Sequence, residues 1–250
     1  MPLLRRFAAA LACVALAGSA AAAPTACRGT LYLTLDTGTM VPAERMAEAL
    51  RTRGIKATFF IANEPTANGK TALDPAYGDF WRRLVADGHA FGSHTWRHWY
   101  LRGDTGADRV RYVKWGGGER ALLDRAGFCR ELAQVDEGFA ALTGHHLAAL
   151  WRAPGGKTTP RALEWAPSCG FTRHVGWSEA GFLGDELPSD KYPNRVLLER
   201  ALAHLRDGDV MMMHLGIRDR REPFADVFEP LLDGLLARGF CFKTLAERGR

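Results

Sequence analysis

Two histidines four residues apart, His94 and His98, have the spacing in this 250-residue chain that points most directly to chemistry. On one turn of helix, two imidazoles at this spacing face the same way and can both reach one metal ion. The spacing also fits histidines of a core or surface, so its meaning depends on where the fold places the pair. Asp36, Arg152 and His214 stand far apart in the sequence, and their types could supply a base, a positioning cation and an acid.

The elements that must position these residues are short apolar runs that alternate with segments of helical period. We expect strands at 31–35, 57–61, 90–93, 148–151, 171–176, 210–213 and 240–245, and helices at 42–53, 80–87, 132–142, 160–168, 198–205 and 224–235. About seven strand–helix units in alternation predict an α/β protein with a parallel sheet, and favour one barrel over two small domains.

The candidate residues come at the carboxyl ends of these predicted strands, in the loop that follows each one. They are, in chain order, Asp36, His94, His98, Arg152, Trp177, Glu179, Asp185 and His214. Because the carboxyl ends of parallel strands meet at one face of a barrel, we expect these side chains to surround one mouth.

Four stretches in this order carry a family resemblance: LTLDTG at 33–38, GSHTWRH at 92–98, RAPGG at 152–156 and MMMHL at 211–215. They resemble the first, second, third and fifth motifs of the polysaccharide deacetylases, the NodB-homology carbohydrate esterases. The run ATFF at 57–60 is similar to the second strand of that family. The resemblance implies a distorted (β/α)7 barrel of the NodB-homology type.

The activity that the resemblance implies is metal-dependent removal of acetyl groups from a glycan, either an N-acetylated sugar polymer or oligomer or an acetylated hemicellulose. A divalent ion, zinc or cobalt, would be held by His94 and His98. Asp36 would act as the base toward a water whose acidity the ion raises, and His214 would protonate the leaving group.

The resemblance also implies supporting roles. Arg152 would hold the base by a charged hydrogen bond, and Asp185 would orient the acid. A backbone N–H at 37–39 would stabilise the oxyanion together with the metal. Trp177 and Leu215 would line the pocket for the acetyl group.

Thr37 departs from the family pattern, in which a second Asp at this position ligates the metal. A hydroxyl is a neutral, poor ligand, so the site should hold zinc less tightly. Three outcomes stay open. The metal binds through His94, His98, Asp36 and water; a carboxylate from elsewhere completes its ligands; or the chain is a catalytically inactive glycan-binding relative. The carboxylates considered for the second outcome are Glu179, Asp185 and Glu186. An amidohydrolase acting on a non-glycan amide is a further alternative, because a fold does not fix its substrate.

Residues 1–23 are typical of a secretory signal peptide, with Arg5 and Arg6 before an apolar stretch at 7–17 and small residues at 18–23. The stretch is too short to span a bilayer, and no later run is long enough, so no stable membrane span is expected after cleavage. We therefore expect an exported protein, periplasmic or secreted, with residues 24–250 as a single catalytic domain. An insertion at about 100–127 interrupts it, and we expect a long loop with short helical pieces there, either solvated or serving as a lid or substrate-contact surface.

Four cysteines remain after the signal, and an even number in an exported chain favours two disulfides with three possible connectivities. We favour Cys27–Cys241 with Cys129–Cys169, because Cys27 precedes the first predicted strand and Cys241 lies in the last. A four-cysteine metal site lacks the close spacing that zinc sites show. The net charge of +5 is mild and no Lys/Arg run occurs, so we expect no nucleic acid partner. The glycan substrate is what the family resemblance implies.

Overall fold

The computed structural model describes residues 27–249, and the predicted signal peptide at 1–23 lies outside them. Its centre is a seven-stranded sheet in the order β10–β1–β2–β3–β7–β8, with β9 also paired to β1, and every neighbouring pair is parallel. The strands are β1 (Gly29–Asp36), β2 (Thr58–Ile61), β3 (Ala90–Ser93), β7 (Leu150–Trp151), β8 (Arg173–His174), β9 (Val210–His214) and β10 (Phe240–Phe242). All seven predicted strands are present, and the predicted α/β barrel class is confirmed as a curled, incompletely closed parallel sheet.

The two faces of β1 show how the sequence positions the sheet. Leu31, Leu33 and Leu35, at every second position, are fully buried in the main core with the helices. Thr34 and Asp36 alternate with them and are buried on the opposite face. This alternation leaves the last residue of β1, a carboxylate, on the inner side of the barrel at its carboxyl end.

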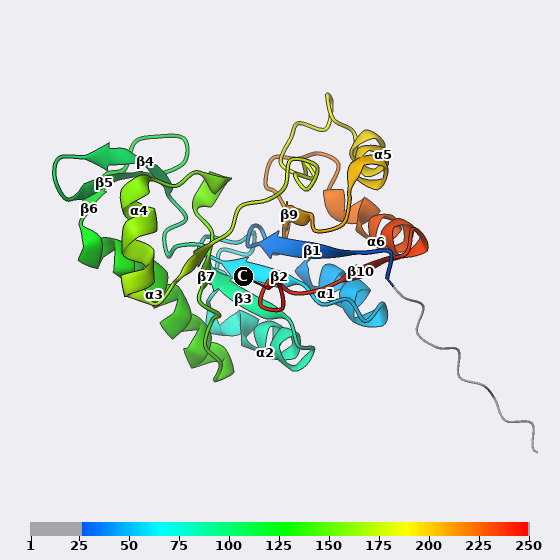
Figure 1. Cartoon of the computed structure of the whole chain (residues 1–250), viewed down its shortest axis with the longest axis horizontal. Coiled ribbons are helices and arrows are strands. Elements are labelled where there is room, and N and C mark those ends of the chain that lie inside the picture. Colours follow the sequence, from blue (N-terminus) through cyan, green and yellow to red (C-terminus); the bar gives the residue numbers. More distant parts are fainter. Residues whose placement is uncertain (1–26, 250) are drawn as a thin grey trace, which may run out of the picture.

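Six helices surround the sheet, as Figure 1 shows. They are α1 (Ala43–Thr52), α2 (Gly78–Ala86), α3 (Arg125–Thr143), α4 (Pro160–Trp165), α5 (Asn194–His204) and α6 (Phe228–Ala237), with four short 3₁₀ segments at Pro75–Tyr77, Pro154–Gly156, Ala166–Cys169 and Phe224–Val227. Each of the six α-helices corresponds to one predicted helix. Within the part of the chain that the structure describes, no helix is long and apolar enough to cross a membrane.

The insertion is a separate three-stranded antiparallel sheet of β4 (Tyr100–Thr105), β5 (Arg109–Val113) and β6 (Arg120–Leu123), at the left of Figure 1. The prediction of a long loop with short helical pieces is therefore wrong. In β5, Val110 and Tyr112 are fully buried while Arg109 and Arg111, which alternate with them, are not, which is the period of a half-buried strand. The buried side chains pack in a second core with Phe128 of α3 and Trp165 of α4.

Both predicted disulfides are present. Cys27–Cys241 joins the residue before β1 to β10, and Cys129–Cys169 joins α3 to the turn after α4. The favoured one of the three connectivities is therefore confirmed.

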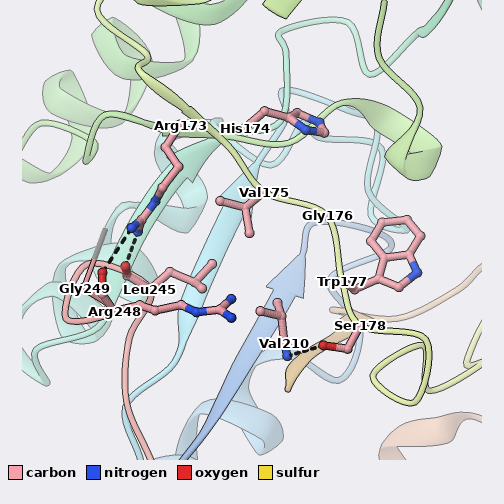
Figure 2. Close-up of a pocket in the computed structure, with 10 residues that line it drawn as sticks. All are labelled: Arg173, His174, Val175, Gly176, Trp177, Ser178, Val210, Leu245, Arg248 and Gly249. Carbon is pink, nitrogen blue, oxygen red and sulfur yellow. Dashed lines mark hydrogen bonds between the residues drawn. The ribbon is translucent and has the colours of Figure 1, made fainter. Parts of the chain in front are cut away.

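The barrel is open between β8 and β9, where no strand pair forms among residues 27–249. The loop after β8 crosses this gap, since Ser178 N–H donates to the Val210 carbonyl and Val210 N–H donates to Ser178 Oγ, both at 3.0 Å. A cavity of about 400 Å³ lies here (Figure 2), where the Arg173 guanidinium donates to the carbonyls of Leu245 and Arg248. Trp177 lines this cavity and the larger one described next, so it separates the two.

Candidate active site

A cavity of about 590 Å³ opens at the carboxyl ends of the sheet strands. Its lining includes these residues discussed from the sequence: Asp36, Thr37, His94, His98, Trp177 and His214. These side chains come from the ends of β1 and β9 and from the loops after β1, β3 and β8. The structure thus brings together residues that are up to 178 positions apart in the sequence, from Asp36 to His214.

Asp36 is the most constrained acid of the cavity and is only 2% exposed. Its Oδ1 accepts a 2.6 Å hydrogen bond from Arg152 Nη1, and its Oδ2 lies 3.4 Å from His94 Nε2. Arg152 is fully buried and also donates to the carbonyls of Val175 and Gly176 at 3.0 Å each. Burial opposes ionisation, but the neighbouring charges, that of Arg152 foremost, hold the pKa of Asp36 below its usual value. Asp36 is therefore an ionised, oriented carboxylate that can accept a proton.

His94 has one ring nitrogen engaged by the main chain and the other facing Asp36. Its Nδ1 lies 2.8 Å from the Arg152 carbonyl, an acceptor only, so this nitrogen carries the proton. Burial is the largest reason that the pKa of His94 falls to about 3, so the ring is neutral. Its Nε2 therefore presents a lone pair toward a carboxylate oxygen, an arrangement that a cation or a donating water would stabilise.

The segment from His94 to His98 is an irregular loop, so the expected helical turn is wrong. Thr95 and His98 have φ of 65° and 55°, in the left-handed region that costs a non-glycine residue about 1–3 kcal/mol. The loop still brings the two imidazoles together, with ring centroids 4.8 Å apart. The predicted pairing of the rings is observed, although the backbone reaches it by another path.

Glu131 of α3 holds this loop in place. It is 4% exposed, and its carboxylate accepts hydrogen bonds from Arg97 N–H at 3.0 Å and Arg97 Nε at 2.6 Å. The Tyr112 hydroxyl of β5 lies 3.0 Å from the same carboxylate. The buried carboxylate has a charged donor on one oxygen and two neutral donors on the other. These hydrogen bonds can offset the cost of the left-handed residues nearby.

Glu64, in the loop after β2, is a residue of the cavity that the sequence reasoning missed. Its Oε1 accepts a 2.7 Å hydrogen bond from the Thr37 hydroxyl, and its Oε2 lies 3.3 Å from His98 Nδ1. The signal was available, because Glu64 is an acid three residues beyond a strand that ends at the same edge of the sheet as the others. Of the three carboxylates that we considered as further metal ligands, Glu186 also lines the cavity, whereas Glu179 and Asp185 do not. Within residues 27–249, no ion pair joins Glu179, Asp185 or Glu186 to the ring of His94 or of His98.

His214, which lines the cavity and is partly buried, is paired with the buried carboxylate of Asp185. Asp185, 2% exposed, accepts from His214 N–H at 2.7 Å, and its carboxylate lies 3.1 Å from His214 Nδ1. Glu186 stands 3.9 Å from Nε2. Although burial works against the charged ring, the Asp185 charge and hydrogen bond, with Asp36 and Glu186, raise the pKa of His214 to about 10. His214 is therefore a protonated imidazolium at neutral pH.

The two residues predicted to line the acetyl pocket have different surroundings. Trp177 borders the cavity. Leu215 is 1% exposed in the main core and is not part of the cavity lining, where Met212 and His214 of β9 stand instead. Strand alternation explains the difference, because Leu215 shares the core side with Met211 and Met213. Its contact with the site is through the main chain, where Leu215 N–H donates to the Asp36 carbonyl at 2.8 Å.

The glycine after Thr37 fits a tight approach between two loops. A Cβ at Gly38 would stand 2.2 Å from the Gly216 carbonyl oxygen, so no larger residue fits without a backbone shift. The N–H groups of Thr37 and Thr39 donate to the carbonyls of Phe60 and Gly216. Of the backbone donors expected for an oxyanion at 37–39, that of Gly38 has no protein acceptor among the described residues.

The donor types here suit a divalent metal such as zinc, since two imidazoles and the carboxylates of Asp36 and Glu64 line the same cavity. The lone pair of His94 Nε2 opposite a carboxylate agrees with a cation. As the side chains lie, they form two pairs, Asp36 with His94 and Glu64 with His98. Within residues 27–249, no three His, Cys, Asp or Glu side chains already stand close enough to hold one ion.

Comparison with known proteins resolves the family. The family model of polysaccharide deacetylases matches residues 23–174, more than half of the chain. The chain belongs to the polysaccharide deacetylase family. This confirms the resemblance drawn from the four motifs, and with it the predicted enzyme class, a polysaccharide deacetylase-like hydrolase of carbon–nitrogen or ester bonds.

Two characterised relatives illustrate the extent of the match. The chain is 34% identical over 119 residues to a chitin deacetylase of Colletotrichum lindemuthianum, covering 42% of this chain and 47% of that protein. It is 25% identical over 233 residues to a chitooligosaccharide deacetylase of Azorhizobium caulinodans, covering 87% and 93%. The chain thus spans about half of the chitin deacetylase and nearly all of the chitooligosaccharide deacetylase.

Solved structures share the fold. A family 4 carbohydrate esterase from Streptomyces lividans, in complex with acetate, matches with a TM-score of 0.65 at 19% identity, covering 88% of this chain and 94% of that one. A family 4 acetyl xylan esterase from Clostridium thermocellum, in complex with cobalt, has the same TM-score and identity, covering 87% and 89%. A CE4 family pseudoenzyme from Bacillus anthracis matches with a TM-score of 0.63 at 16% identity, covering 88% and 64%. The fold of this polysaccharide deacetylase family member is therefore the NodB-homology barrel.

Proposed function

We propose that this protein is an exported, metal-dependent deacetylase that removes acetyl groups from a glycan, with Asp36 as base and His214 as acid. One observation carries the proposal. A carboxylate kept ionised by Arg152 and an imidazolium kept protonated by Asp185 face the same cavity. Acetyl transfer to water needs both functions, because one proton must leave the water and another must reach the leaving group.

The base side of the cavity supports proton abstraction from water. Asp36 has one oxygen bound to Arg152, so its other oxygen, beside His94 Nε2, is the one that would receive the proton. Arg152 fixes the carboxylate plane and is itself held by two carbonyls, so the base does not have to reorganise during the reaction. A divalent ion at His94 and His98 would raise the acidity of water and polarise the acetyl carbonyl.

The acid side supports protonation of the leaving amine or alcohol. His214 Nδ1 is held by Asp185, so Nε2 is the nitrogen from which the proton would leave. Trp177 would contact the acetyl methyl group, and Gly38 N–H would donate to the developing oxyanion. Residues of this chain would thus supply the base, the acid, the oxyanion donor and the contact to the acetyl methyl group.

The substrate and the location are parts of the same proposal. Relatives named as chitin and chitooligosaccharide deacetylases support an N-acetylated sugar polymer or oligomer, and the xylan esterase likeness supports an acetylated hemicellulose as the other substrate class. Two disulfides support an oxidising compartment, which agrees with the signal predicted at 1–23 and with a periplasmic or secreted enzyme.

The test is acetate release by the purified mature chain, with zinc or cobalt supplied, from acetylated glucosamine oligomers, peptidoglycan and acetylated xylan. We expect release from at least one of them, lost in Asp36→Asn and His214→Ala. No release from any of these substrates would reject the proposal. In that case, sugar binding that is insensitive to chelator would support the inactive glycan-binding alternative, and turnover in a screen of small amides would support the amidohydrolase alternative.

A further inference from the structure

We propose that Glu64 is a protein ligand of the divalent metal, in the role of the carboxylate that Thr37 cannot supply. The proposal deepens the function proposed above and rests on it in taking His94 and His98 as metal ligands. It assigns a donor from the loop after β2, a segment outside the four motifs.

The first argument is the engagement of the Thr37 hydroxyl. Its hydrogen is donated to Glu64 Oε1 at 2.7 Å, and its oxygen accepts the Ala62 N–H at 3.1 Å. A hydroxyl bound in this way is neutral and already satisfied, so it is poorly suited to bind a cation. The same hydrogen bond does hold the Glu64 carboxylate at the edge of the cavity, which is how an outer-shell donor orients a ligand.

The second argument is that the other acids of the cavity have partners of their own. Asp36 is paired with Arg152 and Asp185 with His214, while Glu186 lies nearest to His214. Glu64 has its ion-pair contact with His98 alone, and no Lys or Arg is paired with it within residues 27–249. A carboxylate 16% exposed, beside the His98 ring and without a Lys or Arg partner, has the negative charge that a divalent ion needs.

The third argument is that the main chain keeps Glu64 beside the histidine loop. Asn63 N–H donates to the Trp96 carbonyl at 3.0 Å, which ties the loop after β2 to the loop that carries His94 and His98. Ala72 N–H donates to the Glu64 carbonyl at 3.0 Å and fixes the other side of the same loop. Glu64 is therefore positioned against His98 by backbone contacts as well as by its side chain.

The experiment measures metal binding, separately from turnover. The mature chain is stripped with chelator and titrated with Zn²⁺ by calorimetry and with Co²⁺ by visible absorption. The variants are Glu64→Gln, Thr37→Asp and the double variant Thr37→Asp/Glu64→Gln. Glu137→Gln, which removes an exposed charge on α3, is the matched control. Thermal unfolding without metal verifies that each variant is folded.

We expect Glu64→Gln to weaken Zn²⁺ binding by about 100-fold or more, since loss of an outer-shell partner alone costs about 10–100-fold. It should also change the Co²⁺ spectrum, because a ligand is replaced, while Glu137→Gln should change neither. The double variant should recover most of the lost affinity, because Thr37→Asp returns a carboxylate next to the same position.

Two results would overturn the assignment: a folded Glu64→Gln variant that binds Zn²⁺ as tightly as wild type with an unchanged Co²⁺ spectrum, or a wild-type chain that binds neither ion. Acetate release by wild type together with unchanged binding in Glu64→Gln would leave the proposed function standing without this ligand. Metal binding that depends on Glu64 in a chain that releases no acetate would leave the ligand standing and reject the function.

Discussion

The Tyr112 hydroxyl, on the middle strand of the inserted sheet, lies 3.0 Å from Glu131 Oε2 and 2.9 Å from Thr95 Oγ1. A carboxylate only accepts, so the tyrosine donates to Glu131, and Thr95 is left to donate to the tyrosine oxygen. Because Thr95 follows His94, the inserted sheet contacts the loop that carries both histidines. The insertion is therefore a support of the site, and neither a solvated loop nor solely a lid.

This support gives the first prediction. Tyr112→Phe removes the hydroxyl from a buried network and should lower the free energy of unfolding by about 1–3 kcal/mol. It should also weaken Zn²⁺ binding about tenfold, since the loop that carries both histidines loses a constraint. Chemical denaturation and calorimetry measure the two effects. The control is Tyr192→Phe, a change at an exposed tyrosine, and equal metal binding in both variants would contradict the role.

Arg152 gives a second prediction, because its charge and its shape act separately. Arg152→Met leaves Asp36 buried without its partner and should lower the free energy of unfolding by about 3–5 kcal/mol. Arg152→Lys keeps the charge but loses the fork that also reaches Val175 and Gly176, so acetate release should fall roughly 100-fold with a smaller loss of stability. Equal free energies of unfolding for Arg152→Met and Arg152→Lys would show that the charge at position 152 does not contribute to stability.

The pH dependence follows from the imidazolium. A pKa of His214 raised to about 10, above the ordinary 6.5, means that the ion pair with Asp185 stabilises the fold fully below about pH 6.5 and that this contribution is lost as pH rises toward 10. His214, the proposed acid, stays protonated in the folded protein until pH approaches 10, so activity should persist well above neutrality. Asp185→Asn should lower the pKa of His214 and move the alkaline limb of the rate profile toward neutral pH.

Histidine titration by NMR and the pH–rate profile check this prediction together. Asp190→Asn, an exposed acid of the same loop region, should leave both unchanged. An alkaline limb that stays in place in Asp185→Asn would mean that His214 is not the acid that the limb reports.

Trp115 gives a prediction about substrate length. It is 70% exposed, in the turn between β5 and β6, and it borders the catalytic cavity. An exposed aromatic ring at this position would stack on a sugar unit beyond the one that is deacetylated. Trp115→Ala should raise KM for longer oligosaccharides by about tenfold, equivalent to about 1.4 kcal/mol, and leave that for the shortest substrates unchanged. A uniform change in KM at every length would contradict this contact.

The disulfides give a prediction about stability. Replacing Cys27 and Cys241 by serine should lower the free energy of unfolding by about 2–5 kcal/mol, and the loss should exceed that from the Cys129 and Cys169 pair. The reason is loop length, since the two bonds span 214 and 40 residues. Thermal and denaturant unfolding of the two double variants provide the comparison, and the reverse order would show that native-state packing outweighs the chain constraint.

The sequence predicted the barrel because strands such as β2, β3 and β9 are buried on both faces and so read as short apolar runs. The rule that polar residues at strand ends share one mouth then predicted which of them meet, including Asp36 with Arg152. The inserted sheet was missed because its strands alternate apolar residues with arginines, and such short two-sided segments resemble a solvated loop. Glu64, three residues beyond the end of β2, satisfies the same rule but was missed, and its contact with His98 depends on the path of two loops, which the rule does not describe.

The bond between Cys27 and Cys241 closes residues 27–241 into a covalent ring. A protease that cuts one surface loop within this ring, for instance the glycine turn at 116–118, would release no fragment. Such a nicked protein would migrate as one species until it met a reductant. A single cut would then leave Asp36 of β1 and His214 of β9 in one molecule.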